Sequence, residues 1–310
     1  MARRRKGRPV DGILVLDKPL GMSSNQALQV AKRLYGAAKA GHTGSLDPLA
    51  TGVLPLCFGE ATKFSRFLLD ADKAYDSTFV LGVRTASGDA EGEVLSEEKA
   101  GHISEADVEA KLGLFRGDIE QVPSMFSAIK HQGQPLYKLA RKGQEVERKP
   151  RQVCVHELTL VGYRGGEHPE VDVRIRCSKG TYVRSIAEDL GEALGCGAHV
   201  SVLRRTQAGP FETASMVSLT TLEGLAEHGQ QGEMDALLQP LDSALGDMPL
   251  VRVSEAGGHY IRQGQPVLVP NSPCSGMVRM GLETGEFLGI GEILDDGRVA
   301  PRRLIAESRQ

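Results

Sequence analysis

The order in which strand-like and helix-like segments follow one another constrains the fold of this chain most strongly. An apolar run at residues 12–17 ends in a Lys-Pro-Leu-Gly turn and predicts a buried strand. Apolar residues then keep helical spacing over residues 27–34, whereas residues 75–83 alternate as a strand does. The two kinds of segment come in mixed order, without the regular alternation of a doubly wound sheet. This order predicts an α+β domain.

The rest of the chain carries further elements of both kinds. Ser23 or Ser24 can cap the first helix, and Ser104 with Asp107 forms an acidic variant of the capping box. Helices are predicted at residues 61–69, 104–114 and 182–194, and strands at 152–163, 170–177 and 199–205. After Pro249 the pattern changes to short strands separated by glycine and proline, which indicates a small β-rich domain.

The length of 310 residues accommodates one large and one small domain. We therefore divide the chain into a basic tail at residues 1–10, a main domain at 11–249 and a β-rich domain at 250–310. Within the main domain, residues 124–151 are polar and basic and interrupted by glycine and proline, so we expect an inserted arm there.

Several classes of protein are disfavoured by what the sequence lacks. No stretch reaches the roughly 20 apolar residues that cross a bilayer, and no apolar segment follows the basic tail. We expect a cytoplasmic protein that does not bind a membrane. The five cysteines form no CxxC pair, which predicts neither a metal site nor disulfides. No GxGxxG follows a strand, and no GxxxxGK[ST] motif is present, so we expect no cofactor.

Charge is distributed unevenly along the chain. Residues 124–151 hold seven basic and two acidic residues, whereas residues 206–250 hold seven acidic residues and no lysine or arginine. This segregation indicates that one face of the molecule meets a polyanion while another faces solvent.

A loop rich in glycine and proline carries the clearest chemical signal. Residues 41–52 read GHTGSLDPLATG, and the proline holds Asp47 on an extended backbone. A carboxylate fixed in this way can serve as a nucleophile, a base or a ligand. The residues alone are equally consistent with a simple turn.

The run GHTGSLDPLATGVLP resembles the catalytic motif of the TruB family of tRNA pseudouridine synthases. The resemblance covers nearly the whole chain, and its further motifs occur in the family's order: KP and GMSS at 18–24, KAY at 73–75, CSKGTYVR at 177–184, GCGAH at 195–199, LRR at 203–205 and GRVAPRRL at 297–304. It implies a pseudouridine synthase domain with a mixed, largely antiparallel sheet, followed by a small C-terminal PUA domain.

The resemblance implies an isomerase that converts uridine 55 in the T-loop of tRNA into pseudouridine. Uracil is detached from C1′, turned over and reattached through C5, a reaction that needs no cofactor or metal. The family aspartate falls on Asp47. This carboxylate would attack C1′, abstract a proton from C2′ or add to the uracil ring, and the sequence leaves these routes open.

The same resemblance assigns roles to the other site residues. Arg184 matches the arginine that pairs with the aspartate, and Leu203 matches an apolar residue of the pocket. Tyr75 matches a tyrosine that stacks on the base, and its phenol, with an ordinary pKa near ~10, is a weak candidate for removing the C5 proton. His42 matches the histidine that fills the space left by the flipped base, since such a base must leave its stack.

Three further residues follow from the matched motifs. Lys18 and Tyr182 are expected to bind substrate. The segment at residues 85–89 departs slightly from the family pattern but keeps Asp89 and the hydroxyl of Ser87. Asp89 is expected to be structural beside the site and not a second catalytic acid.

The expected partner is tRNA, bound through its T-loop and acceptor end by a monomer. The arm at residues 124–151 corresponds to the family's insert that closes over the T-loop, and Arg302 and Arg303 would contribute to RNA binding in the C-terminal domain. Flipping the base would also assist tRNA folding.

Two other functions were weighed against this one. A noncatalytic RNA-binding protein would use the same arm and tail but would not need Asp47, Tyr75 and Arg184 together. A uridine methyltransferase would need a cofactor site and a cysteine in a glycine- or proline-rich catalytic loop, and the sequence has neither.

Overall fold

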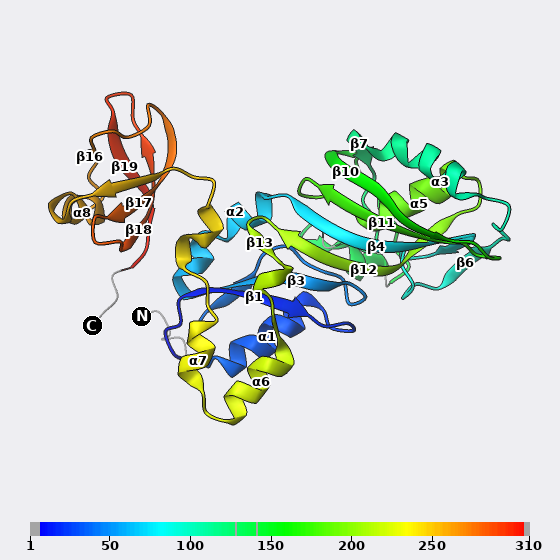
Figure 1. The fold of residues 1–310 in the computed structure, drawn as a ribbon, viewed down its shortest axis with the longest axis horizontal. Coiled ribbons are helices and arrows are strands. Elements are labelled where there is room, and N and C mark those ends of the chain that lie inside the picture. The colour runs from blue at the N-terminus through cyan, green and yellow to red at the C-terminus, as the bar shows by residue number, and fades with distance from the viewer. Residues whose placement is uncertain (1–6, 128, 141, 307–310) are drawn as a thin grey trace.

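The computed structural model describes residues 7–127, 129–140 and 142–306, and most of the predicted basic tail, residues 1–6, lies outside this range. One large mixed sheet runs through the main part of the molecule (Figure 1). Its strands follow the order β14-β1-β3-β12-β4-β11-β10-β7, with β2 beside β3 and β13 beside β12. Neighbouring strands are antiparallel except at the β1–β14 and β3–β12 pairs. The predicted α+β fold with a largely antiparallel sheet is confirmed.

The strands of this sheet are β1 (Gly12–Lys18), β2 (Ala40–His42), β3 (Thr51–Phe58), β4 (Lys73–Leu81), β7 (Gly117–Gln121), β10 (Arg151–Arg164), β11 (Glu170–Cys177), β12 (Ala198–Ala208), β13 (Phe211–Glu212) and β14 (Val217–Ser218). Two short hairpins lie outside it, formed by β5 (Val83–Thr85) with β6 (Val94–Glu97) and by β8 (Lys130–His131) with β9 (Gln134–Pro135).

Helices cover the large sheet in two groups, one toward each end (Figure 1). The helices α1, α6 and α7 contact one another beside β1, whereas α3 and α5 pack near β10 and β12. Their bounds are α1 (Ser24–Leu34), α3 (Glu105–Leu112), α5 (Val183–Ala193), α6 (Leu219–Glu227) and α7 (Gln231–Ala236). Both groups bury apolar side chains in one continuous core.

Local sequence signals explain where two of these helices begin. The Ser23 hydroxyl accepts a hydrogen bond from the backbone N–H of Gln26, whose side chain bonds back to the Ser23 backbone. The predicted pair of Ser104 and Asp107 forms the same reciprocal cap on α3. The other candidate cap, Ser24, is buried inside α1 and has a different task in the site described below.

The C-terminal part forms a second, smaller core. It contains β15 (Leu250–Val253), α8 (Glu255–Arg262), β16 (Val267–Leu268), β17 (Gly276–Leu282), β18 (Phe287–Ile293) and β19 (Arg298–Leu304). Its strands form a separate sheet in the order β15-β17-β18-β19-β16. The expectation of strands alone was incomplete, because α8 was missed. The helix contains the pair Gly257-Gly258, and glycine is unfavourable in helices. A Cβ at position 258 would lie 2.5 Å from Leu282 Cδ2, so Gly258 permits α8 to pack closely on β17.

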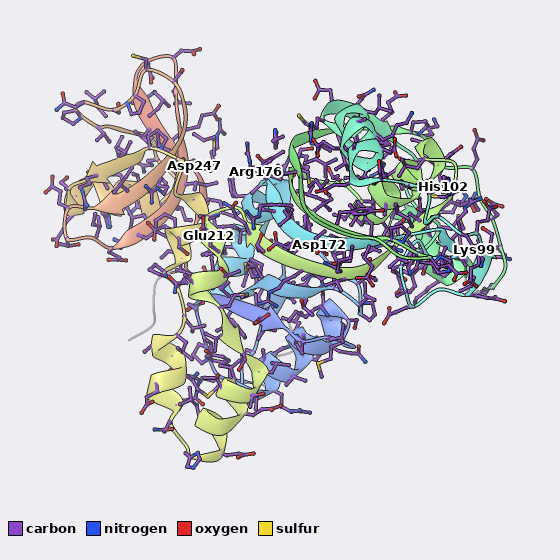
Figure 2. The ribbon with its side chains drawn as sticks, turned by 45° about the vertical axis from the view of Figure 1, so that its right-hand side comes forward. Lys99, His102, Asp172, Arg176, Glu212 and Asp247 are labelled. Atoms are coloured by element: carbon purple, nitrogen blue, oxygen red, sulfur yellow. The ribbon has the colours of Figure 1, made fainter. Side chains whose placement is uncertain are left out.

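The two parts meet through a small apolar and polar contact. The rings of Phe64 and Phe287 pack edge to face with centroids 5.5 Å apart, beside buried Leu245. The Lys63 ammonium donates to the backbone carbonyl of Leu304 at 2.9 Å. Asp247 lies in the segment that joins the two parts, far from Lys99 and His102 at the opposite end of the molecule (Figure 2).

Two local expectations need correction, and the basic arm can be described further. The predicted helix at residues 61–69 is broken, because a 3-10 helix at Gly59–Lys63 is followed by α2 (Ser65–Asp70). The loop at residues 41–52 is bounded by β2 and β3, which take up its two ends. The basic arm contains the β8–β9 hairpin and the short helix α4 (Leu136–Ala140) in its described portion.

No helix within the described residues is long and apolar enough to span a membrane. At the start of the described chain, the Arg8 guanidinium binds both oxygens of Asp235 at 2.6 and 2.7 Å. The end of the predicted tail is therefore attached to α7.

Candidate active site

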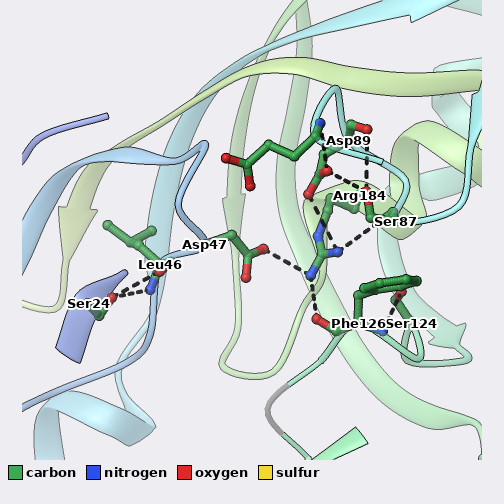
Figure 3. Close-up of polar contacts among 9 residues, drawn as sticks. Ser24, Leu46, Asp47, Ser87, Asp89, Ser124, Phe126 and Arg184 are labelled. Carbon is green, nitrogen blue, oxygen red and sulfur yellow. Dashed lines mark hydrogen bonds and ion pairs between the residues drawn. The ribbon is translucent and has the colours of Figure 1, made fainter. Parts of the chain in front are cut away.

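The loop between β2 and β3 is held on both sides of Asp47. The Ser24 hydroxyl of α1 exchanges two hydrogen bonds with the backbone of Leu46, at 2.7 and 3.0 Å (Figure 3). On the other side, the carbonyl of Pro48 accepts from the backbone N–H of Gly21 at 2.9 Å. The segment at residues 18–24 therefore fixes the loop immediately before and immediately after Asp47.

Lys18 also holds the backbone on both sides of the contact between residues 18–24 and the loop. Its side chain is fully buried, and its ammonium donates to the carbonyls of Pro19 at 2.8 Å, Met22 at 2.5 Å and Pro48 at 3.4 Å. Burial lowers the pKa of Lys18 to about 8, with partial compensation from Asp47. The ammonium is thus occupied by backbone carbonyls, and Lys18 is not among the residues that line the cavity described below.

Asp47 and Arg184 form an ion pair. The distance between Arg184 Nη2 and Asp47 Oδ2 is 2.9 Å, and the arginine side chain is 4% exposed whereas the carboxylate is 38% exposed. Figure 3 shows the carboxylate facing the guanidinium across the site. The sequence resemblance implied this pairing, and the structure brings the two side chains together although they are distant in the chain.

The Arg184 guanidinium has three further partners. It donates to the backbone carbonyls of Ser87 at 2.7 Å and Phe126 at 3.2 Å, and it lies 3.6 Å from an oxygen of Asp89. Phe126 belongs to the base of the basic arm, so one guanidinium connects the arm, the turn at residues 85–89 and Asp47. Because both terminal nitrogens of the group are engaged, its position is closely determined.

Asp89 is buried and organises its own turn. It accepts from the Ser87 hydroxyl at 2.5 Å and from the backbone N–H of Glu91 at 3.2 Å. Its carbonyl accepts from the Thr85 hydroxyl at 2.7 Å. These contacts agree with the expected structural role beside the site, and they show why the hydroxyl of Ser87 matters there.

The electrostatic environment of Asp47 contains opposing influences. Burial raises the pKa of this carboxyl above its ordinary value, Arg184 lowers it, Asp89 raises it and Lys18 lowers it. The guanidinium is therefore the principal group that favours the ionised form. An ionised carboxylate at the edge of a cavity is suited to act as a nucleophile or a base.

A cavity of about 300 Å³ lies beside Asp47. Five of the seven predicted site residues line it: Asp47, Tyr75, Tyr182, Arg184 and Leu203. Tyr75 lies on β4 and Leu203 on the adjacent strand β12. Burial raises the pKa of the Tyr75 phenol, an effect that Arg205 partly offsets. The phenol is therefore protonated near neutral pH.

His42 lies at the end of β2, half-buried and outside the lining of this cavity. Within the described residues its buried Nδ1 atom has no hydrogen-bond partner. Burial lowers the pKa of the imidazole, and the charge of Arg205 lowers it further. A neutral ring suits stacking.

Sequence reasoning did not single out all of the cavity's residues. Lys73, Ser127 and Arg205 also line it. Arg205 had a usable signal, because alternation along β12 places it on the same face as Leu203. Lys73 belongs to the KAY motif at residues 73–75 but was given no role, and Ser127 carried no comparable signal. No cluster of histidine, cysteine and acidic side chains that could hold a metal was found in the described ranges.

Comparison with protein families gives consecutive matches along the chain. Residues 32–183 match the N-terminal domain of the TruB family pseudouridylate synthases. Residues 184–246 match the C-terminal domain of tRNA pseudouridylate synthase B, and residues 249–305 match the C-terminal part of pseudouridine synthase II TruB.

Three curated relatives share more than half of their residues with this chain. The tRNA pseudouridine synthase B of Stutzerimonas stutzeri is 57% identical over 97% of this chain and 98% of that protein. The protein of the same name from Pseudomonas aeruginosa is 56% identical over 97% and 98%. The one from Coxiella burnetii is 53% identical over 96% of each chain.

Solved structures show the same fold at lower identity. A chain of a Cbf5–Nop10–Gar1 complex aligns with a TM-score of 0.71 and 24% identity, covering 94% of this chain and 84% of that one. A chain of an H/ACA RNP bound to a substrate RNA containing 2′-deoxyuridine gives 0.71 and 22%, covering 98% and 91%. At these identities the likeness concerns the fold.

Proposed function

The chain belongs to the TruB family of pseudouridine synthases, and from this premise we propose that it isomerises uridine 55 in the T-loop of tRNA to pseudouridine. The observation that carries the proposal is the ion pair of Asp47 and Arg184 at the edge of a cavity that Tyr75 also lines. A protein that only binds RNA has no need for an exposed carboxylate held against a buried guanidinium.

The reaction breaks the bond from N1 to C1′ and forms one from C5 to C1′, while C5 loses a proton and N1 gains one. Reactant and product therefore have the same composition. Asp47 would attack C1′, take a proton from C2′ or add to the uracil ring. Each route begins from the ionised carboxylate, so Arg184 supports all three by favouring that form.

The other lining residues would orient the base. Tyr75 would stack on the uracil ring, and Leu203 and Tyr182 would contact it from the remaining sides of the cavity. A phenol that burial keeps protonated would first donate a hydrogen bond. It would accept the C5 proton only after its own proton had left, and only once C5 has bonded to C1′.

Uridine must leave its stack before it can enter the cavity. We propose that the neutral ring of His42 occupies the space left behind and stacks on the remaining nucleotides. Lys18 would assist binding through the carbonyls it holds, since these fix the loop around Pro48.

We propose that the arm at residues 124–151 closes over the T-loop and that the β-rich C-terminal domain, PUA-like in this proposal, contacts the acceptor end through Arg302 and Arg303. The enzyme would act in the cytoplasm as a monomer and would assist tRNA folding when it opens the T-loop. The contact of Arg184 with the Phe126 carbonyl supports the first point, because it places the base of the arm at the site.

Tritium release from a T-arm minihelix labelled at C5 of uridine tests the proposal. The wild type should release tritium, and carbodiimide mapping of intact tRNA should place the product at position 55. Asp47→Asn should bind the RNA but release none. The matched control is Asp76→Asn, which removes a carboxylate paired with Arg174 on exposed strand positions and should act normally. Substantial release by Asp47→Asn would overturn the assignment.

A further inference from the structure

Arg205 is a buried cation at the base of the cavity. Its side chain is 1% exposed and ranks among the largest fully buried side chains of the protein. Among the residues that the structure describes, no carboxylate forms an ion pair with it. A guanidinium in such a place needs other partners, because burying an unsatisfied charge is very costly.

Those partners are backbone carbonyls at the two ends of the catalytic loop. Arg205 Nε donates to the carbonyl of Val53 at 2.7 Å, and Nη2 donates to the carbonyl of Gly44 at 3.2 Å. Gly44 precedes Asp47 by three residues, and Val53 follows it in β3. One side chain therefore spans the base of the loop that presents the carboxylate.

The same guanidinium also lies beside the phenol of Tyr75. Arg205 is opposite Tyr75 in the β4–β12 register, both side chains line the cavity, and the guanidinium partly offsets the rise that burial causes in the phenol pKa. On its other side, Arg205 lies opposite Gly52 of β3. A Cβ at Gly52 would lie 2.2 Å from the Arg205 carbonyl, so only glycine permits this close approach of the two strands.

The neighbouring arginine provides an internal comparison. Arg204 points to the opposite face of β12, where it binds both oxygens of Asp17 at 2.9 and 3.1 Å. It does not line the cavity. Two adjacent arginines of the same strand thus differ in their contacts with the site.

We infer that Arg205 is a positioning residue that holds the Gly44–Asp47 segment and the Tyr75 phenol in register, so that carboxylate and phenol face the same cavity. The inference rests on the proposed roles of Asp47 and Tyr75. It adds a residue that acts through both of them without touching the reacting atoms.

Arg205→Gln and Arg205→Lys test this role in single-turnover tritium release at saturating enzyme. Neither side chain spans both carbonyls and the phenol, so both variants should lose about 100-fold in rate, the loss expected for a misplacement of about 1 Å. RNA affinity should remain unchanged, and Arg204→Gln should keep the wild-type rate. A wild-type rate in Arg205→Gln would overturn the inference. A wild-type rate in Arg205→Lys would show that a positive charge at this position is sufficient for the rate, and it would also overturn the positioning role.

A second measurement does not depend on folding of these variants or on turnover. In enzyme labelled with ¹⁵N-arginine, Tyr75→Phe should shift the Arg205 Nη resonances and leave the Nε resonance, bonded to Val53, in place. Unchanged Nη resonances would contradict the shared contact. Absence of pseudouridine formation by the wild type would refute the proposed function, and the NMR result would still decide whether the guanidinium links the loop and the phenol.

Discussion

Replacing Arg184 by methionine should displace the acid limb of the pH–rate profile. The substitution removes the cation 2.9 Å from Asp47 and leaves the carboxylate of Asp89 nearby. Two unit charges about 4 Å apart interact by about 4 kcal/mol at an effective dielectric constant of about 20. Because the Asp47 side chain is 38% exposed, solvent screening reduces this interaction, and we take about half, or about 2 kcal/mol.

About 2 kcal/mol corresponds to about 1.5 pKa units. Under the proposed mechanism Asp47 reacts in its ionised form, and loss of the guanidinium favours the protonated form. The acid limb of Arg184→Met should therefore move upward by about 1.5 pH units. On that limb the single-turnover rate at a given pH should fall by about 30-fold.

The assay is single-turnover tritium release between pH 5 and pH 8.5, with thermal melting to confirm that each variant is folded. Arg184→Lys keeps a cation and should move the limb less. Arg184→Met combined with Asp89→Asn should bring the limb back down, because the remaining like charge is removed. Superimposable acid limbs for the wild type and Arg184→Met would refute the reasoning, whatever their plateau rates.

Two further predictions concern stability. Gly52→Ala should lower the free energy of unfolding by about 3 kcal/mol or more, because φ is +98° at this position and the new Cβ would meet the Arg205 carbonyl. The control Gly113→Ala places its Cβ in open space and should leave the stability nearly unchanged. Equal urea midpoints for the two variants would contradict the prediction. Asp189→Asn should stabilise the protein at pH 7, because burial, with Glu192, raises the pKa of Asp189 to about 6. The folded state binds this proton more tightly than the unfolded state does. Asp189 therefore lowers the free energy of unfolding as pH rises from about 4 to about 6, by at most about 3 kcal/mol. A gain in melting temperature that persists at pH 3.5 would show another cause.

Much of the fold could be predicted because its signals are local. The strand expected at residues 170–177 coincides with β11 (Glu170–Cys177), and Ser104 with Asp107 caps α3 as expected. The helix α8 was not predicted because it contains two consecutive glycines, which have low helix propensity. The order of the sheet could not be read either, since β1 pairs with β3 and β14, and such pairing depends on contacts distant in sequence.

In the candidate site too, some residues could be predicted from the sequence and others could not. Asp47 was identifiable because a glycine- and proline-rich loop and a specific motif mark it. Its pairing with Arg184 came from the family resemblance, and the structure adds the geometry. The backbone contacts that support the site could not be predicted, because Arg205 and Lys18 donate to backbone carbonyls. Every residue has such a carbonyl, so no residue type in the sequence identifies the partner.

Support by carbonyls has an electrostatic consequence for the cavity. Lys73, whose pKa burial lowers to about 8, donates to the carbonyls of Leu68 at 3.1 Å, Leu69 at 2.8 Å and Ala71 at 2.5 Å. Lys73 and Arg205 are both cations that line the cavity and donate to backbone carbonyls. A carboxylate partner would cancel their charge, but a carbonyl dipole does not. The positive field therefore reaches the cavity, where Asp47 is the one acidic residue among those that line it. This field would stabilise the electron-rich uracil that forms, in the proposed reaction, once the bond to C1′ has broken.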